Sequence, residues 1–389
     1  MLALSPGKNR RVLLGHPWIY RGEILRVDGK LAPGDIVDVV DIHGRFIGRG
    51  YANPASQIFV RLLTRRQDEE IDRAFFRRRL ETAAAYRRLF VRDTTAYRLV
   101  NAEADFLPGL IVDRYGDHLV LQTLTLGIDR HKELVADILE ELFAPAGIYE
   151  RNDATVRELE GLPLRIGLLR GRYEGPVTVE ENGIRLEIDL AEGQKTGFFL
   201  DQRENRAVVR SLVGGARVLD CFCYAGGFAV NAACFGAREV VAVDISGAAL
   251  ALARRNAELN GVADRLVLRE GNGFDVLREM VGAGERFDVV ILDPPSFTKS
   301  KEAVPGALRG YKEINLRGMK LLPPGGYLVS CSCSYHVTEG LFLDVIAQAA
   351  RDAGRVLRLV ELRRQAKDHP MLLASPETYY LKCAILQVW

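Results

Sequence analysis

The chain of 389 residues has no apolar run near the roughly 20 residues that a membrane-spanning helix needs. Its first residues, MLALSPGKNRR, carry charge and are followed by no hydrophobic segment, so we expect no signal peptide. Its six cysteines all lie after residue 220, which is unlike a disulfide framework and suits a reducing compartment. We therefore expect a cytoplasmic protein that does not contact membranes.

The sequence also lacks a strong overall charge, because its formal net charge is only +2. Residues 1–95 nevertheless hold 18 Lys and Arg against 11 Asp and Glu, a local balance of +7 that leaves −5 for the rest. Arginine provides most of these cations, and its planar fork suits phosphate. A solvated surface would show the same pattern, so the charge alone leaves nucleic-acid binding open.

The pattern of hydrophobic and turn-forming residues changes twice along the chain, which predicts three domains. Residues 1–72 contain short β-branched runs between Gly, Pro and Asn turns, a pattern typical of a small antiparallel β-barrel. Residues 73–188 begin with an arginine-rich amphipathic helix and continue with a Gly-turned hairpin and a second helix, which predicts a central α+β domain. Residues 189–389 form the third predicted domain.

The third domain alternates strand, loop and helix. Its strands are nearly continuous apolar runs, as in RVLDC at 217–221 and FDVVILD at 287–293. Such strands indicate a parallel sheet covered by helices on both faces. Seven strands, the last pair near the C-terminus, predict an α/β fold with a doubly wound sheet closed by a hairpin.

Ligands of doubly wound sheets bind beyond the carboxyl ends of the strands. The first strand ends in Asp220 and continues as C-F-C-Y-A-G-G-F, where Gly226 lets the backbone approach a ligand closely. G-x-G-x-x-G is absent, which disfavours a dinucleotide, while a carboxylate at this place suits a cationic group. The second strand ends in Asp244, whose spacing suits ribose hydroxyls, and Asn272 follows the third and can read an adenine edge. One such residue could be only a helix N-cap. Three in this order favour S-adenosylmethionine.

The fourth predicted strand runs into Asp293-Pro294-Pro295-Ser296-Phe297. The prolines stiffen the loop, which then presents a carboxylate and an aromatic ring to a flat, nitrogen-bearing ring. An ordinary proline-rich turn is the alternative.

The fifth strand carries V-S-C-S-C-S-Y, with Cys331 deeper in the strand and Cys333 nearer its exit. Three roles compete: small buried hydrophobe, metal ligand and nucleophile. C-F-C and C-S-C end different strands about 10 Å apart, with one strand between them, which disfavours zinc. A thiolate that adds to carbon 6 of cytosine makes carbon 5 nucleophilic toward a methyl-sulfonium. This chemistry favours Cys333 as the nucleophile and Cys331 as packing, with Asp293 stabilising charge at ring nitrogen 3.

Nearly the whole chain resembles bacterial ribosomal-RNA methyltransferases that join an N-terminal PUA domain to a class I S-adenosylmethionine domain, the type that makes 5-methylcytosine in large-subunit rRNA. The motifs that carry the resemblance are GHPWIY at 15–20, GRGYANPASQI at 48–58, RLVNAEADFLPGLIVDRY at 98–115, KTGFFLDQR at 195–203, DCFCYAGGF at 220–228, LDPPSF at 292–297, SCS at 332–334, DHP at 368–370 and PETYYLK at 376–382.

The resemblance implies that residues 1–72 bind RNA, that Cys333 is the nucleophile and that S-adenosylmethionine is the cofactor. The residues expected around the cofactor are Gln202, Arg203, Asp220, Phe222, Tyr224, Gly226, Asp244, Ser246, Asn272, Gly273 and Asp293. Asn272 stands where an aspartate is more usual. Ser296 stands where many RNA cytosine-C5 enzymes have a second cysteine, which leaves the acceptor of the carbon-5 proton unassigned.

Two other functions stay open at this stage. An enzyme that methylates an exocyclic amine would use Asp293 and backbone carbonyls without a nucleophile. A non-catalytic RNA-binding assembly factor would keep the fold and lose the reaction. The sequence leaves the target nucleotide, the substrate particle and the oligomeric state open, with a homodimer among the options.

Overall fold

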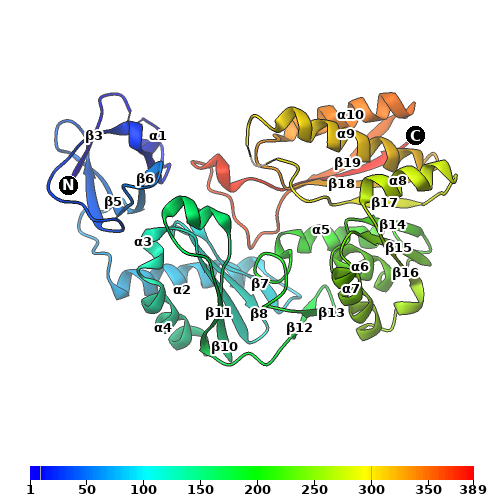
Figure 1. The fold of residues 1–389 in the computed structure, drawn as a ribbon, viewed down its shortest axis with the longest axis horizontal. Helices are drawn as coiled ribbons and strands as arrows, with labels where there is room; N and C mark the ends of the chain where they lie inside the picture. The colour runs from blue at the N-terminus through cyan, green and yellow to red at the C-terminus, as the bar shows by residue number, and fades with distance from the viewer. Residues whose placement is uncertain (9, 299) are drawn as a thin grey trace. The chain divides into compact units, whose positions relative to one another are not determined.

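The computed structural model describes residues 1–8, 10–298 and 300–389 (Figure 1). The chain forms two compact units. The first comprises Met1–Glu180, Ile188–Leu200 and Lys367–Thr378, and the second comprises Glu181–Glu187, Asp201–Ala366 and Tyr379–Trp389. The division into three domains at residues 72 and 188 stays a prediction, and the two units are described separately.

The first unit begins with a six-stranded sheet in the order β2-β6-β5-β4-β1-β3. All its described pairs are antiparallel except β1 with β4. The elements are β1 (Leu2–Leu4), α1 (Arg10–Leu13), β2 (Trp18–Tyr20), β3 (Ile24–Val27), β4 (Ile36–Val40), β5 (Phe46–Ala52) and β6 (Ile58–Thr64). Its buried centre consists of aliphatic side chains such as Leu4, Val39 and Val60. The short β-branched runs therefore formed strands as the sequence predicted.

A five-stranded sheet follows in the order β11-β10-β9-β8-β7. The predicted hairpin is β8 with β9, and helices α2 and α4 correspond to the two predicted helices. The elements are α2 (Arg73–Phe90), β7 (Ala96–Asn101), β8 (Leu110–Tyr115), β9 (His118–Thr123), α3 (Leu126–Asp129), α4 (Lys132–Phe143), β10 (Gly147–Asn152) and β11 (Arg165–Gly171). Phe75, Phe76 and Leu80 of α2 are fully buried in the core of this region. A separate two-stranded sheet comprises β12 (Val177–Glu181) and β13 (Ile184–Ile188).

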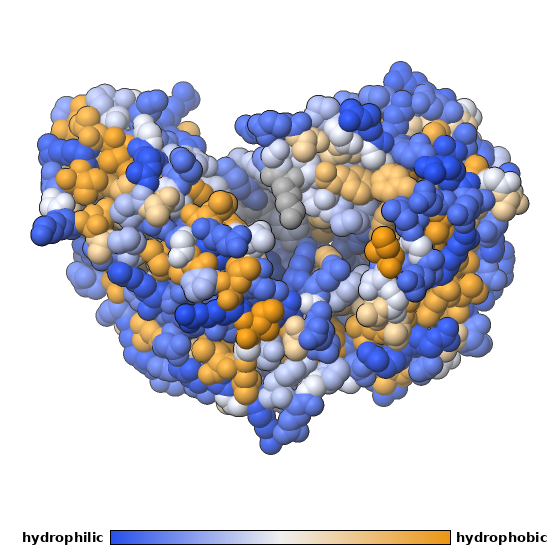
Figure 2. All heavy atoms as spheres, viewed as in Figure 1, coloured by the Kyte–Doolittle hydropathy of each residue, from blue (hydrophilic) through white to orange (hydrophobic). Residues whose placement is uncertain are grey.

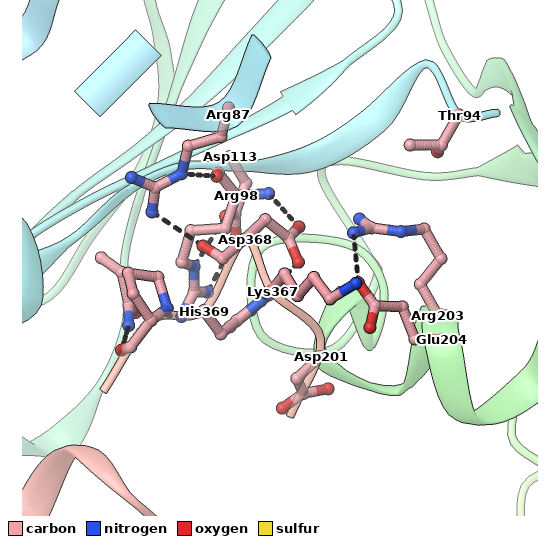
Figure 3. A network of polar contacts seen from close by, with 12 residues as sticks. Arg87, Thr94, Arg98, Asp113, Asp201, Arg203, Glu204, Lys367, Asp368 and His369 are labelled. Carbon is pink, nitrogen blue, oxygen red and sulfur yellow. Dashed lines mark hydrogen bonds and ion pairs between the residues drawn. The ribbon is translucent and has the colours of Figure 1, made fainter. Parts of the chain in front are cut away.

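The segment Lys367–Thr378 lies between β19 and β20 in sequence yet belongs to the first unit. Figure 3 shows Arg87 and Arg98 converging on it. Arg87 donates to the backbone oxygen of Asp368 at 2.7 Å, and the backbone N–H of Arg98 donates to its carboxylate at 2.8 Å. The Arg98 side chain also pairs with Asp113. Charged groups buried in this way need such partners, so these contacts fix the segment.

The second unit contains a seven-stranded sheet in the order β16-β15-β14-β17-β18-β20-β19. Strands β14 to β18 are parallel, and β20 runs antiparallel between β18 and β19. The strands are β14 (Arg217–Cys221), β15 (Glu239–Asp244), β16 (Leu266–Glu270), β17 (Val289–Leu292), β18 (Tyr327–Ser332), β19 (Leu357–Arg363) and β20 (Lys382–Val388). The predicted doubly wound sheet with a closing hairpin is confirmed.

Helices cover both faces of this sheet: Figure 1 shows α8, α9 and α10 on one side and α6 and α7 on the other. The helices are α5 (Arg203–Val208), α6 (Gly227–Cys234), α7 (Gly247–Leu259), α8 (Gly273–Gly282), α9 (Val304–Lys320) and α10 (Glu339–Ala353). Fully buried Leu219, Leu292 and Phe342 belong to the core that α8 to α10 share with the strands. Both strand faces are buried, which explains the continuous apolar runs.

Hydrophilic residues cover much of the face drawn in Figure 2, and apolar residues appear there in small groups. Among the described helices, none combines the length and the apolar character that crossing a bilayer requires.

Candidate functional site

The site forms where the central strands β14, β15, β17 and β18 end. The order in which the strands follow one another across the sheet reverses at β14, because β15 lies on one side of it and β17 on the other. Parallel strands place their carboxyl ends along one edge, and the reversal leaves a crevice there. Asp220, Asp244, Asp293 and Cys333 stand at or directly after these ends.

Asp220 is fully buried, and no described side chain donates a hydrogen bond to its carboxyl oxygens. The backbone N–H of Ala229 is near enough to lower its pKa, but it meets neither oxygen at good hydrogen-bonding geometry. Burial, and next the negative charge of Asp293, raise the pKa of Asp220 to about 8. Asp244 adds to the same effect. A buried acid without partners is costly for a folded chain, and a bound cation would remove that cost.

The loop after β14 adopts an unusual backbone. The φ angles of Phe222, Tyr224 and Gly226 are 70°, 49° and 78°. These values lie in the left-handed region, which residues other than glycine seldom adopt. The N–H groups of Phe222 and Cys223 both donate to the carbonyl of Val243 at 2.9 Å, which holds the loop against the end of β15. Strained loops of this kind concentrate at ligand sites.

Asp244 fixes two neighbouring turns. One carboxylate oxygen accepts the N–H of Tyr224 at 2.8 Å and the other accepts the N–H of Ser246 at 2.9 Å. Ser246 in turn caps α7 by accepting the N–H of Ala249 at 3.2 Å. The two loops are thereby held together by one side chain.

Asn272 caps α8, because its side-chain oxygen accepts the N–H of Phe274 at 2.9 Å. The residue is exposed, and within the described part of the chain its amide nitrogen donates to no acceptor that would compete with a ligand. Gly273 is buried, and a Cβ at that position would lie 2.6 Å from the ring of Phe222. Glycine therefore lets the third strand end approach the loop after the first.

Gln202 links the start of α5 to the fourth strand end, since its amide donates to Asp293 at 2.9 Å. Asn205 donates to the Gln202 oxygen at 2.6 Å and so orients that amide. Both Gln202 and Arg203 are buried, and the Arg203 guanidinium lies 3.8 Å from Glu204. The structure thus brings Gln202 to Asp293.

The two cysteines of β18 differ sharply. Cys331 is fully buried opposite Cys383 of β20, and contact with Cys383 together with burial raises the pKa of its thiol far above the usual value. Cys333 follows the last residue of β18, is half-buried, and has its sulfur 4.0 Å from the carbonyl oxygen of Pro294. Only Cys333 of this pair combines access with proximity to the Asp293 loop.

A group of polar residues lies close to Cys333 in the chain or in the sheet, and of these the sequence analysis had given a possible role only to Ser296. Ser334 shares hydrogen bonds of 3.0 Å with both Ser296 and Tyr311, and Ser332 donates to Tyr311 at 2.9 Å. Lys382 of β20 donates to the carbonyl of Ser334 at 2.8 Å. The sequence gave no sign that these serines and Lys382 lie close together, because their contacts depend on the pairing of β18 with β20.

The residues at this edge fit S-adenosylmethionine. The orphaned Asp220 carboxyl group suits a cationic amino acid portion, and Asp244 suits hydroxyl groups. Rings of Phe222 and Phe274 lie 6.4 Å apart at the same strand ends and offer apolar surface. Within the described residues, no group of three or more metal-ligating side chains comes together.

Comparisons with known proteins agree with this geometry. Residues 167–373 match the family described as S-adenosylmethionine-dependent methyltransferase, and residues 2–65 match a PUA-like domain. A relative from Shewanella amazonensis, named ribosomal RNA large subunit methyltransferase I, is 45% identical over 100% of this chain and 99% of its own. A relative of the same name from Tolumonas auensis is 44% identical over 99% of this chain and 98% of its own.

Two solved structures share the fold along the whole chain. A methyltransferase crystallised with SAH has a TM-score of 0.86 at 22% identity and covers 99% of both chains. A SAM-dependent methyltransferase from Streptococcus mutans has a TM-score of 0.84 at 21% identity, again with 99% of both chains covered.

Proposed function

Since the chain belongs to the family of S-adenosylmethionine-dependent methyltransferases, we propose that it methylates carbon 5 of a cytosine in large-subunit ribosomal RNA, with Cys333 as the nucleophile. S-adenosylmethionine is the cofactor and, when bound, supplies the methyl group. The names of the relatives support large-subunit ribosomal RNA as the substrate. The PUA-like domain and the +7 charge of residues 1–95 support binding of the chain to RNA.

One observation carries the choice of chemistry. A half-buried thiol, Cys333, lies 4.0 Å from the carbonyl of Pro294, directly after Asp293, on neighbouring strand ends. A flat base beside Asp293 would therefore meet a nucleophile at its edge. Methylation of an exocyclic amine needs no thiol at this position, so that alternative does not explain why Cys333 lies beside the Asp293 loop.

The reaction follows from these groups. The Cys333 thiolate adds to carbon 6, and a new S–C bond forms while the electron pair of the C5–C6 double bond becomes available at carbon 5. Asp293, whose carboxyl group accepts the Gln202 amide, acts here in its protonated form and donates its proton to nitrogen 3, which neutralises the negative charge that develops there. Carbon 5 would use this electron pair to form the bond to the methyl group, while the methyl–sulfur bond breaks and the sulfur leaves as a neutral thioether. The carbon-5 proton then passes to water, nitrogen 3 returns its proton to Asp293, the C5–C6 double bond forms again, and Cys333 leaves as the thiolate with its electron pair.

The residues proposed to hold the cofactor are those gathered at the strand ends. Asp220 would meet the cationic end, Asp244 and Ser246 the ribose, and Asn272 and Gly273 the adenine. Phe222, Tyr224 and Gly226 would shape the loop between them, and Gln202, Arg203 and Asp293 would close the site on the substrate side. We keep the cytoplasm as the expected location for such an RNA enzyme.

The test is nucleoside mass spectrometry on unmodified large-subunit rRNA, naked and in ribosomal particles, after incubation with labelled S-adenosylmethionine. We expect label in 5-methylcytidine, and we expect Cys333→Ala to lower turnover by roughly a thousandfold or more while cofactor binding persists. Cys234→Ala, which removes a half-buried thiol at the end of α6, is the control and should keep full activity. Label in a methylated amine would reject the proposal, as would full activity of Cys333→Ala.

A further inference from the structure

Lys382 is a buried cation that the proposed reaction has not used. It is the first residue of β20 and only 2% exposed. Its ammonium donates to the backbone oxygens of Ser334 and Tyr380, both at 2.8 Å. Neither acceptor is charged, so these contacts alone do not offset the cost of burying an ammonium group.

Strand pairing brings this ammonium to the backbone next to the thiol. Lys382 lies opposite Ser332 in the antiparallel pair of β18 and β20, one residue before Cys333. Its side chain then reaches the carbonyl of Ser334, one residue after Cys333. The lysine therefore spans the backbone on both sides of Cys333, and the two groups interact electrostatically.

The other groups near the sulfur work against a thiolate. The carbonyl of Pro294, at 4.0 Å, favours the protonated thiol as a hydrogen-bond donor. Asp293 and Tyr311 belong to the same cluster, and a negative charge on Asp293 would repel a thiolate. Lys382 is a cation that opposes these effects.

We propose that Lys382 is a positioning residue whose ammonium group stabilises the thiolate form of Cys333. The proton that the thiol loses goes to solvent, and Lys382 keeps its own proton throughout. The catalytic meaning of this thiolate rests on the function proposed above, but the acidity of Cys333 can be measured without any RNA or cofactor.

The charges that face Lys382 agree with this role. Burial lowers the pKa of Lys382 to about 8, while a thiolate on Cys333 and the carboxylate of Glu339 on α10 raise it. The ring of Tyr379 lies 5.9 Å from the ammonium. Since a lysine is charged below its pKa, the thiolate is supported at neutral pH and loses its support as the pH rises above about 8.

The test measures the rate of iodoacetamide alkylation of Cys333 against pH, followed by mass spectrometry of the peptide that contains it. The full-length protein is used, with Cys234→Ala as the background because that thiol is also half-buried. Only the thiolate reacts, so the midpoint of the rate profile reports the acidity of Cys333. Two neutral replacements are compared, Lys382→Gln, which keeps N–H donors for both carbonyls, and Lys382→Met, which keeps none.

We expect both variants to raise the midpoint by about one pH unit or more, because a neighbouring opposite charge moves a pKa by that amount. At pH 7 alkylation should then be about tenfold slower. A midpoint in Lys382→Gln equal to that of the parent would overturn the proposal, since lysine would then act only as a hydrogen-bond donor. This readout stays valid in a fold-checked Gln variant even if the Met variant does not fold.

A second measurement separates this proposal from the proposed function. If Cys333 is the nucleophile, 5-methylcytidine formation by Lys382→Gln should fall about tenfold at pH 7 and recover toward higher pH, where the thiol ionises unaided. Absence of 5-methylcytidine from the parent enzyme would reject the proposed function, while the alkylation midpoints would still decide the role of Lys382.

Discussion

At the scale of single residues, the sequence predicted which polar residues stand at the ends of the strands but not the environment of each group. Asp220, Asp244 and Asp293 follow apolar strands, and that pattern alone placed them at one edge. That Asp220 has no partner, and that its neighbours are also acids, depends on contacts between three strands. Lys382 was missed for the same reason, because only the pairing of β20 with β18 brings it to Cys333.

The acidity of Asp220 predicts how cofactor affinity depends on pH. Its pKa is raised from an ordinary carboxyl value to about 8, so without ligand the group holds its proton below pH 8. A cationic ligand binds the ionised form, and each pH unit below 8 then weakens binding by up to about tenfold. We expect affinity for S-adenosylmethionine, measured by calorimetry, to rise from pH 6 to pH 8 and then level off.

Asp220→Asn is the matching variant, since the amide has the same shape and no charge. It should bind the cofactor more weakly at pH 8 and lose most of the pH dependence. A parent protein whose affinity is the same at pH 6 and pH 8 would argue against ionisation of Asp220 on binding.

At the scale of elements, the order and type of the strands of the seven-stranded sheet could be predicted because burial on both faces leaves continuous apolar runs. The segment Lys367–Thr378 could not be predicted in the same way. Its contacts join Arg98 to Asp368, which are 270 residues apart, and no local pattern encodes such a pair. The buried ion pair of Arg206 with Glu181 is equally invisible to periodicity.

The loop from β14 to α6 gives a prediction that separates backbone strain from crowding. Gly226 has a φ of 78°, and a Cβ there would lie 2.9 Å from that of Ala253. Gly261 has a similar φ of 67° with nothing within 4 Å of a Cβ. Gly261→Ala should cost about 1 kcal/mol of folding free energy from strain alone. Gly226→Ala should cost more and weaken cofactor binding, as urea unfolding and calorimetry would show. If the two variants lose the same folding free energy and cofactor binding stays intact, the loop must be able to shift and accommodate the added methyl group.

At the scale of the whole molecule, the chain combines a PUA-like domain, matched over residues 2–65, with a methyltransferase domain, matched over residues 167–373. Composition predicted this pairing only in part, because the net charge of +2 conceals the +7 of residues 1–95. Half of the ten exposed arginines of that region form ion pairs, as Arg66 does with Asp68, so the count of cations overstates what is available to RNA.

Arg65 stands apart in that region and provides the test of RNA binding. Burial lowers its pKa with no acidic group acting in the opposite direction, and its guanidinium donates to the carbonyl of His16. It lines a cavity of about 360 Å³ together with Arg79 and the half-exposed ring of Phe106. The Arg79 guanidinium lies over the Phe106 ring, 5.4 Å from its centroid, and about half of the Phe106 side chain stays exposed. Arginines and exposed aromatic rings are groups that bind phosphate and stack on unpaired bases.

We expect Arg65→Gln to weaken binding of a single-stranded rRNA fragment, measured by fluorescence anisotropy, and to reduce the slope of log affinity against log salt by about 0.7, the value for one phosphate contact. Arg254→Gln removes the same charge from the exposed surface of α7 and serves as the control, with an unchanged slope. Phe106→Ala should weaken binding without changing the slope, since stacking releases no counterions. Phe90→Ala, which removes a ring of similar exposure, 46% against 49%, should have little effect. Equal losses in Arg65→Gln and Arg254→Gln would show that binding follows net charge and not this cavity.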